Sequence, residues 1–206
     1  MHAQELIEDI DDLLPQTPAA RPGGSLLVMA GLPGAGKSHI VRHLQRLVPC
    51  VVVSTDRVRL YVRGKPTYTA AEMVYMYEIC YGIIDKRLRA GQRVVFDGSN
   101  YLAARRQRVA DIAARNNAPL ALGHVQASEP VTRARLTRRM SSGEDGDDLS
   151  DAGWLVYQWM VEAQEPIEGP HLVLDTSATP AGILAHRLYD YWMECEQTFA
   201  SPDVYL

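Results

Sequence analysis

Residues 26–48 read LLVMAGLPGAGKSHIVRHLQRLV, and this segment carries the strongest structural signal in the chain. Its apolar run LLVMA (26–30) predicts a buried strand, and the periodicity of residues 37–47 predicts a helix. Between them, GLPGAGKS (31–38) matches the pattern Gly-x-x-x-x-Gly-Lys-Ser/Thr. A strand, a glycine-rich turn and a helix in this order form the context in which the pattern wraps around phosphate groups. The sequence therefore predicts a phosphate-binding loop at 31–38.

Each residue type in this loop has a physical reason. Glycines let backbone N–H groups approach phosphate oxygens with no Cβ in the way. The following helix adds unpaired N–H groups and the positive end of its dipole. Lys37 can reach the β- and γ-phosphates of a nucleotide, and the Ser38 hydroxyl can ligate Mg²⁺. The residues predicted to contact the nucleotide are Gly31, Leu32, Pro33, Gly34, Ala35, Gly36, Lys37, Ser38 and His39.

The rest of the chain alternates short apolar runs with stretches of helical periodicity. Short runs rich in valine are typical of parallel strands that are covered on both faces. We therefore expect an α/β fold in one domain, 25–206, with a five-stranded parallel sheet between helices and right-handed crossovers. The expected strands are 26–30, 51–54, 93–97, 120–127 and 171–175, and the expected helices are 37–47, 70–90, 102–117, 130–140, 151–164 and 180–196.

The first 24 residues are expected to form an arm. Leu6, Ile10, Leu13 and Leu14 recur at helical spacing, and the acidic residues lie on the opposite face. The prolines and glycines that follow end this helix. The arm packs either on the body of its own chain or on a second subunit, which would give a homodimer. A frayed tail is an equal alternative.

Composition and charge exclude several classes of protein. The chain has 206 residues, of which 47% are hydrophobic and 22% charged, as is typical of globular proteins. The net charge of −4 arises within the first 24 residues, so any contact with nucleic acid must be local. No apolar run reaches the roughly 18 residues that span a bilayer, and no secretory signal begins the chain. With three separated cysteines, these features predict a cytoplasmic protein without membrane contact.

Charged residues follow the second expected strand. Asp56 lies at its carboxyl end, beside the phosphate-binding loop, where ligands bind in open parallel sheets. There it can accept a proton from an attacking hydroxyl, although it can also simply cap the next helix. Arg59, one helical turn later, can hold a substrate phosphate or the group in transfer.

The third expected strand ends in FDGSN (96–100). Asp97 follows apolar residues, as the acidic residue of a Walker B motif does, and can hold Mg²⁺ directly or through water. Ser99 and Asn100 either face the substrate or cap the helix expected at 102–117. We therefore expect Asp97 to be a second Mg²⁺ ligand beside Ser38.

Arginines mark a possible lid at about 131–164. Arg135 and Arg139 are four residues apart and share one helix face. The polar stretch 141–150 follows, and Ser150 can cap the next helix. This helix–loop–helix unit can close over ATP and neutralise the charge that develops in transfer. A solvated arginine face is the alternative.

Aromatic and basic side chains elsewhere bear on the substrate. Tyrosines in or near the helix expected at 70–90 either stack on a base or sugar or pack in the core. A basic group at 105–108 either contacts a nucleic-acid strand or decorates an exposed helix. These residues are Tyr68, Tyr75, Tyr77 and Tyr81, and Arg105, Arg106 and Arg108.

Taken together, these motifs resemble the P-loop kinases related to polynucleotide kinase and zeta toxin, a group that includes AAA-type predicted kinases. The resemblance covers roughly residues 25–190. It implies a general base at Asp56, a substrate-side arginine at Arg59, lid arginines at Arg135 and Arg139, and ATP as the nucleotide. It rests on GLPGAGKS (31–38), STDRVR (54–59), VVFDGSN (94–100), the arginine pair, SDA (150–152) and LVLDTS (172–177).

The sequence leaves two functional classes open. The first is an ATP- and Mg²⁺-dependent kinase that uses Lys37, Asp56, Arg59 and Arg139 to transfer the γ-phosphoryl group to a hydroxyl. A polynucleotide 5′-hydroxyl is its first expected acceptor, followed closely by a nucleoside, sugar or antibiotic. The second class is an ATP-binding regulatory protein without phosphotransfer, whose acidic arm binds a partner.

Overall fold

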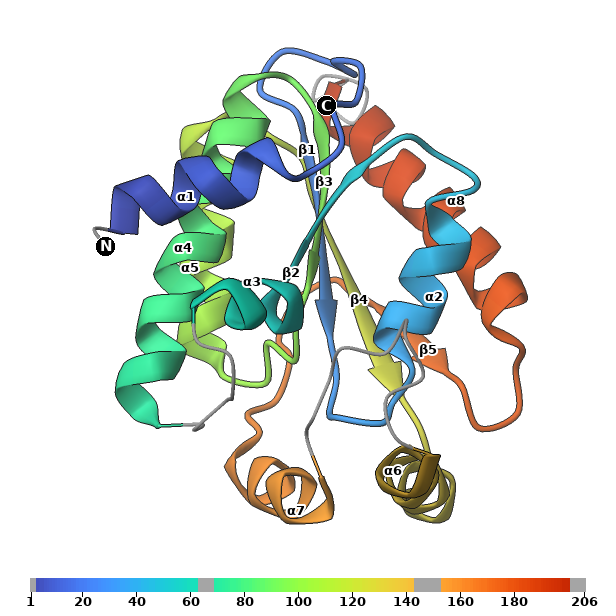
Figure 1. The fold of residues 1–206 in the computed structure, drawn as a ribbon. Helices are drawn as coiled ribbons and strands as arrows, with labels where there is room; N and C mark the ends of the chain where they lie inside the picture. Colours follow the sequence, from blue (N-terminus) through green and yellow to red (C-terminus); the bar gives the residue numbers. More distant parts are fainter. Residues whose placement is uncertain (1–2, 63–68, 143–152, 201–206) are drawn as a thin grey trace.

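The computed structural model describes residues 3–62, 69–142 and 153–200, and its centre is a five-stranded parallel sheet (Figure 1). The strand order is β2-β3-β1-β4-β5, which places the strand before the phosphate-binding loop in the middle of the sheet. The expected strands are confirmed to within two residues at each end. They are β1 (Ser25–Ala30), β2 (Val51–Ser54), β3 (Arg93–Asp97), β4 (Leu120–Gln126) and β5 (Leu172–Asp175).

Helices cover both faces of the sheet, and a further pair lies at its carboxyl edge (Figure 1). One face carries α1 (Ala3–Asp12), α3 (Thr55–Val62), α4 (Ala70–Arg89) and α5 (Ala103–Arg115), and the other carries α2 (Lys37–Leu44) and α8 (Ala181–Ala200). The pair at the carboxyl edge is α6 (Glu129–Ser142) and α7 (Trp154–Ala163).

Strand alternation divides the core into two layers. Every residue of β1 is buried, and successive side chains point to opposite faces of the sheet. Leu26 and Val28 belong to the hydrophobic cluster under α4 and α5. Leu27 and Met29 belong to the cluster under α2 and α8. Burial on both faces is why this strand reads as an unbroken apolar run.

The arm packs on the body of its own chain. Leu6, Ile10 and Leu14 are buried against α4, as expected, but Leu13 is 62% exposed, so its assignment to the apolar face was wrong. Gly82 permits this contact, since a Cβ there would lie 2.3 Å from Ile7 Cδ1. The homodimer through this arm stays a prediction.

One acidic residue of the arm is buried rather than solvated. Asp11 pairs with Arg87 and, at 2.7 Å, with Lys86 Nζ, both on α4. Arg87 also donates to Gln16 Oε1 at 3.0 Å, and Gln92 donates to the carbonyl of Thr17. The segment after α1 is thereby fixed to the end of α4 and the start of β3.

Cys50, Cys80 and Cys195 are free thiols. Burial raises the pKa of Cys50 to about 12 and raises that of Cys80 as well. Within 3–62, 69–142 and 153–200, no helix combines the length and apolar character that crossing a membrane requires.

Candidate active site

The loop 31–38 adopts a conformation that requires glycine. Gly31 has a φ of +144°, and a Cβ there would lie 2.2 Å from the carbonyl oxygen of Val125. Gly36 has a φ of +97° and is the N-cap of α2, with no side-chain cap. The loop therefore leads directly into the helix N-terminus, where unpaired N–H groups attract anions.

The end of β3 braces the start of the loop. Gly31 N donates to the carbonyl of Ser99 at 2.9 Å, and the buried Asn100 donates from Nδ2 to the carbonyl of Met29 at 2.7 Å. Neither Ser99 nor Asn100 caps α5. The N-cap of this helix is Leu102, and the N–H of Ala103 donates to a Glu165 carboxylate oxygen. The capping alternative was therefore wrong.

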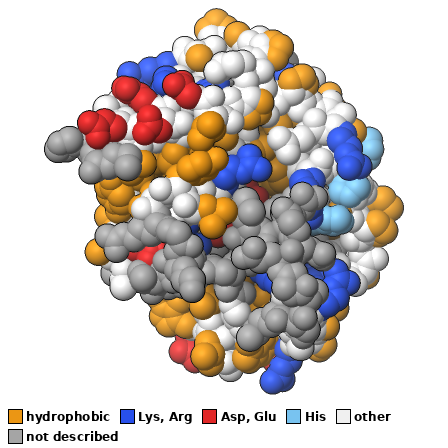
Figure 2. Space-filling view, in the orientation of Figure 1, with side chains coloured by type: hydrophobic (Ala, Val, Ile, Leu, Met, Phe, Trp, Pro, Cys, Tyr) orange, Lys and Arg blue, Asp and Glu red, His pale blue; other side chains and the backbone are white. Residues whose placement is uncertain are grey.

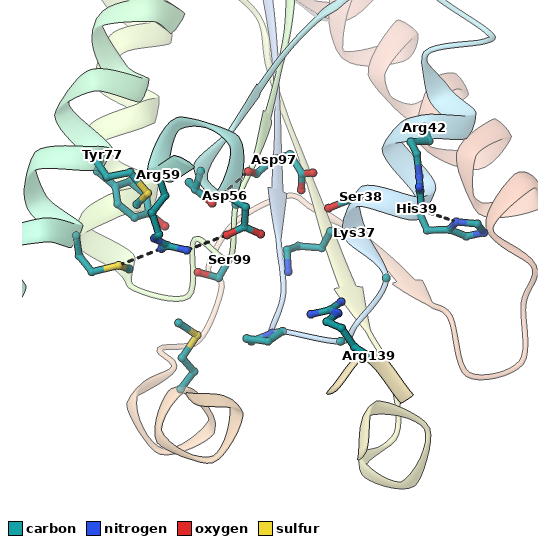
Figure 3. Close-up of a pocket in the computed structure, with 18 residues that line it drawn as sticks. Lys37, Ser38, His39, Arg42, Asp56, Arg59, Tyr77, Asp97, Ser99 and Arg139 are labelled. Carbon is teal, nitrogen blue, oxygen red and sulfur yellow. Dashed lines mark hydrogen bonds and ion pairs between the residues drawn. The ribbon is translucent and has the colours of Figure 1, made fainter. Parts of the chain in front are cut away.

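The predicted site residues converge on one cavity of about 110 Å³ at the carboxyl edge of the sheet (Figure 3). We call it the central cavity. Lys37 and Ser38 lie on one side of it, Asp56 and Arg59 on the other, and Asp97 between them. The predicted residues that line it are Pro33, Gly34, Gly36, Lys37, Ser38, His39, Asp56, Arg59, Asp97 and Arg139.

Four predicted residues lie outside this lining. Ala35 is buried. The carbonyls of Gly31 and Leu32 accept hydrogen bonds from Lys37 Nζ at 2.8 and 3.0 Å. Arg135 lines an adjacent cavity of about 550 Å³. The loop thus presents only part of its sequence to the central cavity.

Arg135 holds the loop from the outside. Its Nη1 donates to the carbonyl of Gly34 at 3.1 Å and to Thr176 Oγ1 at 2.8 Å, and its Nη2 donates to the carbonyl of Thr176 at 2.9 Å. Thr176 Oγ1 itself donates to the carbonyl of Ala35 at 2.7 Å. Burial lowers the pKa of Arg135, and Asp175 opposes that shift. In this structure Arg135 stabilises the shape of the loop, and its contact with nucleotide stays a prediction.

On the opposite side of the central cavity, one arginine lies between two carboxylates. Arg59 Nη1 donates to Asp56 Oδ1 at 3.0 Å, and its Nε lies 3.4 Å from Glu72 Oε1. Ser54 Oγ accepts from the N–H of Arg57, so α3 has its side-chain cap from Ser54 and not from Asp56. Asp56 lies in the first turn of α3 and lines the central cavity.

Sequence reasoning missed Glu72. It stands three residues after Thr69 in TAAE (69–72), which is the pattern of a helix capping box. Thr69 does cap α4, with its Oγ1 accepting from Glu72 N at 3.3 Å. The Glu72 carboxylate, however, is buried against Arg59. A capping pattern gives no signal of such a second use.

Methionines and a tyrosine form the apolar wall of the central cavity, and sequence reasoning missed the methionines. Met73, Met76 and Tyr77 reach it from α4, and the buried Met160 reaches it from α7. Methionine carries no periodic or charged signal that separates a cavity wall from a core. Tyr77, whose use for stacking or core packing was open, is both buried and part of this wall.

Basic side chains cluster on the side of the cavity formed by the phosphate-binding loop and α2. Figure 2 shows Lys, Arg and His side chains on the right, over α2, and the acidic side chains of α1 at the upper left. Burial, and then Arg42 and His43, lower the pKa of His39 below its ordinary value. His39 and Arg42 both line the central cavity. This side of the cavity therefore suits an anionic ligand such as a polyphosphate.

The basic group of α5 is engaged within the protein. Arg105 lies over the Tyr77 ring, 4.1 Å from its centroid. Arg106 donates to the carbonyls of Asn100, Glu165 and Pro166, which ties the segment after α7 to the end of β3. Arg108 lies 3.9 Å from Glu78. These contacts give Arg105 and Arg106 structural roles.

Only part of the expected lid lies in the described part of the chain. Arg139 of α6 and Met160 of α7 both line the central cavity, so these two helices meet there. Residues 143–152, which include Ser150 and the SDA segment, lie outside the described ranges, as does Tyr68. The lid as a moving unit stays a prediction.

Comparisons with known proteins agree with this fold. A family model described as "AAA domain" matches residues 26–164. The structure resembles Mycobacterium tuberculosis APS kinase in complex with AMPPNP and APS, with a TM-score of 0.65 and 14% identity over 82% of this chain and 98% of that one. It also resembles a Sinorhizobium meliloti gluconokinase, with a TM-score of 0.61 and 20% identity over 89% and 99%.

A third similar structure is Kti12 from Chaetomium thermophilum in complex with ADP-AlF3. Its TM-score is 0.63, with 18% identity over 82% of this chain and 99% of that one. At these identities the likeness shows the shared fold, that of the P-loop NTPases.

Proposed function

The chain belongs to the AAA-domain family, and on that premise we propose that it is an ATP-dependent kinase that transfers a phosphoryl group to a substrate hydroxyl. The observation that carries the proposal is the position of Asp56. Its carboxyl lines the same cavity as Lys37 and the glycine loop, on the facing side (Figure 3). An alcohol between them would have a base on one side and a phosphate cradle on the other.

The chemistry follows from these two sides. The acceptor oxygen forms a bond to the γ-phosphorus while the bond from that phosphorus to the β–γ bridging oxygen breaks, and ADP leaves. Asp56 takes the proton of the acceptor hydroxyl. Lys37 and Arg139 stabilise negative charge on the transferring group. Arg59 is a positioning residue in this scheme, because it orients the Asp56 carboxylate.

Mg²⁺ fits the residues on the sheet side of the cavity. The Ser38 hydroxyl and the Asp97 carboxylate are hard oxygen donors that line the same cavity and are the ligand types that Mg²⁺ prefers. Ser38 and Asp97 would hold the ion, which supplies neutralisation of phosphate charge when bound. We include Mg²⁺ in the proposal for this reason.

The proposal has two forms, which differ in the chemical class of the acceptor hydroxyl. A polynucleotide 5′-hydroxyl follows from the resemblance of the motifs, whereas the small volume of the central cavity, about 110 Å³, favours a small molecule. An ATP-binding protein without transfer is the competing class.

A labelled-ATP screen tests the function. The purified chain is incubated with Mg²⁺, γ-labelled ATP and a panel of 5′-hydroxyl oligonucleotides, nucleosides, sugars and aromatic alcohols. We expect one class to be labelled, and Asp56→Asn to lower kcat by about 10²- to 10⁴-fold with ATP affinity unchanged. Asp111→Asn, on the exposed surface of α5, is the matched control. ATP binding without any labelled acceptor would overturn the kinase in favour of the binding protein.

A further inference from the structure

We propose that the acceptor is a small uncharged alcohol with an aromatic body, bound between Asp56 and the wall of Met73, Met76, Tyr77 and Met160. The inference rests on the proposed function and names its substrate class. Two independent observations carry it, which are the apolar wall around the base and the neutralised arginine beside it.

The wall is apolar and adaptable. Its three methionines are buried and come from two elements, α4 and α7. Methionine is flexible and polarisable, and its sulfur makes favourable contacts with the edges of aromatic rings. Such a wall offers a ring good contacts at several orientations and offers a sugar few partners for its hydroxyls.

Tyr77 gives the wall a rigid member. Arg105 covers its ring at 4.1 Å from the centroid. The Phe96 ring lies 5.9 Å away in a T-shaped arrangement, and the Tyr81 ring lies 5.8 Å away. These contacts hold the Tyr77 ring in one place, so it can serve as a fixed surface against the body of a ligand.

The charge on this side of the cavity disfavours an anionic acceptor. Among described residues that line the cavity from α3, α4, β3 and α7, Arg59 is the one cation. Its guanidinium already faces both Asp56 and Glu72, at 3.0 and 3.4 Å. The formal charges of these three side chains sum to −1, so they offer an incoming phosphate or carboxylate no net attraction.

This charge pattern separates the two acceptor forms. A polynucleotide end carries a phosphate on the 3′ oxygen of the same sugar that bears its 5′-hydroxyl, and it would need a cation near Asp56. An uncharged aromatic alcohol needs only the hydroxyl contact to Asp56 and the apolar wall.

The test compares pairs of acceptors in which one member carries an added anionic group. One pair is 2-(4-methylphenyl)ethanol and 4-(2-hydroxyethyl)benzoate, and the other is thymidine and thymidine 3′-monophosphate. With γ-labelled ATP and Mg²⁺, we expect kcat/KM for the uncharged member of each pair to be about tenfold higher or more. We also expect the aryl ethanol to be used better than thymidine, and 5′-hydroxyl oligonucleotides to remain unlabelled.

A charge variant probes the cause. Glu72→Gln removes one of the two carboxylates that face Arg59. The preference for the uncharged acceptor, measured as the ratio of the two kcat/KM values, should therefore fall by about tenfold. Glu78→Gln, on the exposed side of the same helix, should leave the ratio unchanged. If Glu72→Gln fails to fold, the kcat/KM ratios of the wild type still test the inference.

The outcomes separate this inference from the proposed function. Labelled transfer that favours the charged members, or the oligonucleotides, would overturn the inference and leave the kinase intact. Equal use of both members would also overturn it. Absence of transfer to every acceptor, with ATP bound, would overturn the kinase and the inference with it.

Discussion

Arg59 Nη1 donates a 3.0 Å hydrogen bond to Asp56 Oδ1, one helical turn earlier on α3. The pair is local in sequence, but its surroundings are not. Glu72, from the start of α4, approaches the same guanidinium, and Met73 Sδ lies 3.4 Å from its Nη2. The orientation of the candidate base therefore depends on the packing of two helices.

Replacing Arg59 by glutamine should misplace the base without affecting the nucleotide. We expect Arg59→Gln to lower kcat by about 10- to 100-fold, because small errors in position are costly in transfer reactions. ATP affinity should stay the same, since Asp56 and Arg59 lie on the side of the central cavity that faces the phosphate-binding loop. Steady-state kinetics and calorimetric ATP titration measure the two effects. Arg57→Gln, on the exposed side of α3, should change neither, and an equal loss of ATP binding in Arg59→Gln would contradict the assignment.

Gly31 and Gly169 offer a matched pair of glycines with positive φ. Gly31→Ala places a Cβ 2.2 Å from the Val125 carbonyl oxygen, whereas a Cβ at Gly169 has nothing within 4 Å. Gly31→Ala should therefore displace the loop and weaken ATP binding by more than about tenfold. Gly169→Ala should cost only about 1–2 kcal/mol of backbone strain and leave ATP binding intact. Thermal unfolding with and without ATP distinguishes them, and similar ATP-induced stabilisation in both variants would refute the prediction.

The arm contributes to stability through Asp11. Asp11→Asn leaves the Arg87 guanidinium, only 3% exposed, without its charged partner, which should lower the free energy of unfolding by about 3 kcal/mol. Asp12→Asn, at the exposed neighbouring position, should change it by less than about 0.5 kcal/mol. Urea unfolding of both variants measures the difference. Equal effects at the two positions would show that α1 does not depend on the buried pair.

Acid should weaken the contact between β3 and α8. Arg93 donates from Nε and Nη2 to the two carboxylate oxygens of Glu196, each at 2.8 Å. Burial alone would raise the pKa of Glu196, but the hydrogen bonds from Arg93 and Ser25 outweigh it, so the pKa lies below its ordinary value of 4.5. A lowered folded-state pKa stabilises the fold above the ordinary value, and this stability is lost as pH falls through the folded-state pKa.

The prediction for Glu196→Gln follows from that sign. The variant should be about 1–3 kcal/mol less stable than the wild type at pH 7, and the difference should shrink as the pH falls below about 4. Urea unfolding at pH 7, 5 and 3.5 measures it. Glu194→Gln, which is exposed on the same helix, controls for loss of charge alone. A difference that grows toward low pH would contradict the prediction.

The sheet and the phosphate-binding loop could be predicted from the sequence alone. Strand burial and the glycine pattern are local properties, because a run such as LLVMA must be covered on both faces and a loop such as GLPGAGKS needs backbone freedom at fixed positions. Asp56 and Asp97 could also be predicted as site residues, since each lies at the carboxyl end of a recognisable strand and parallel strands end at one edge of the sheet.

The set of side chains that line the central cavity could not be predicted in the same way, because it depends on tertiary packing. Glu72, which the sequence analysis missed, faces Arg59. Met160 lines the cavity from a helix more than 100 residues after the loop. Asp11 looked solvated and is buried against α4. The physical reason is that periodicity reports which face of an element is covered, whereas the partner that covers it is fixed by how distant elements pack.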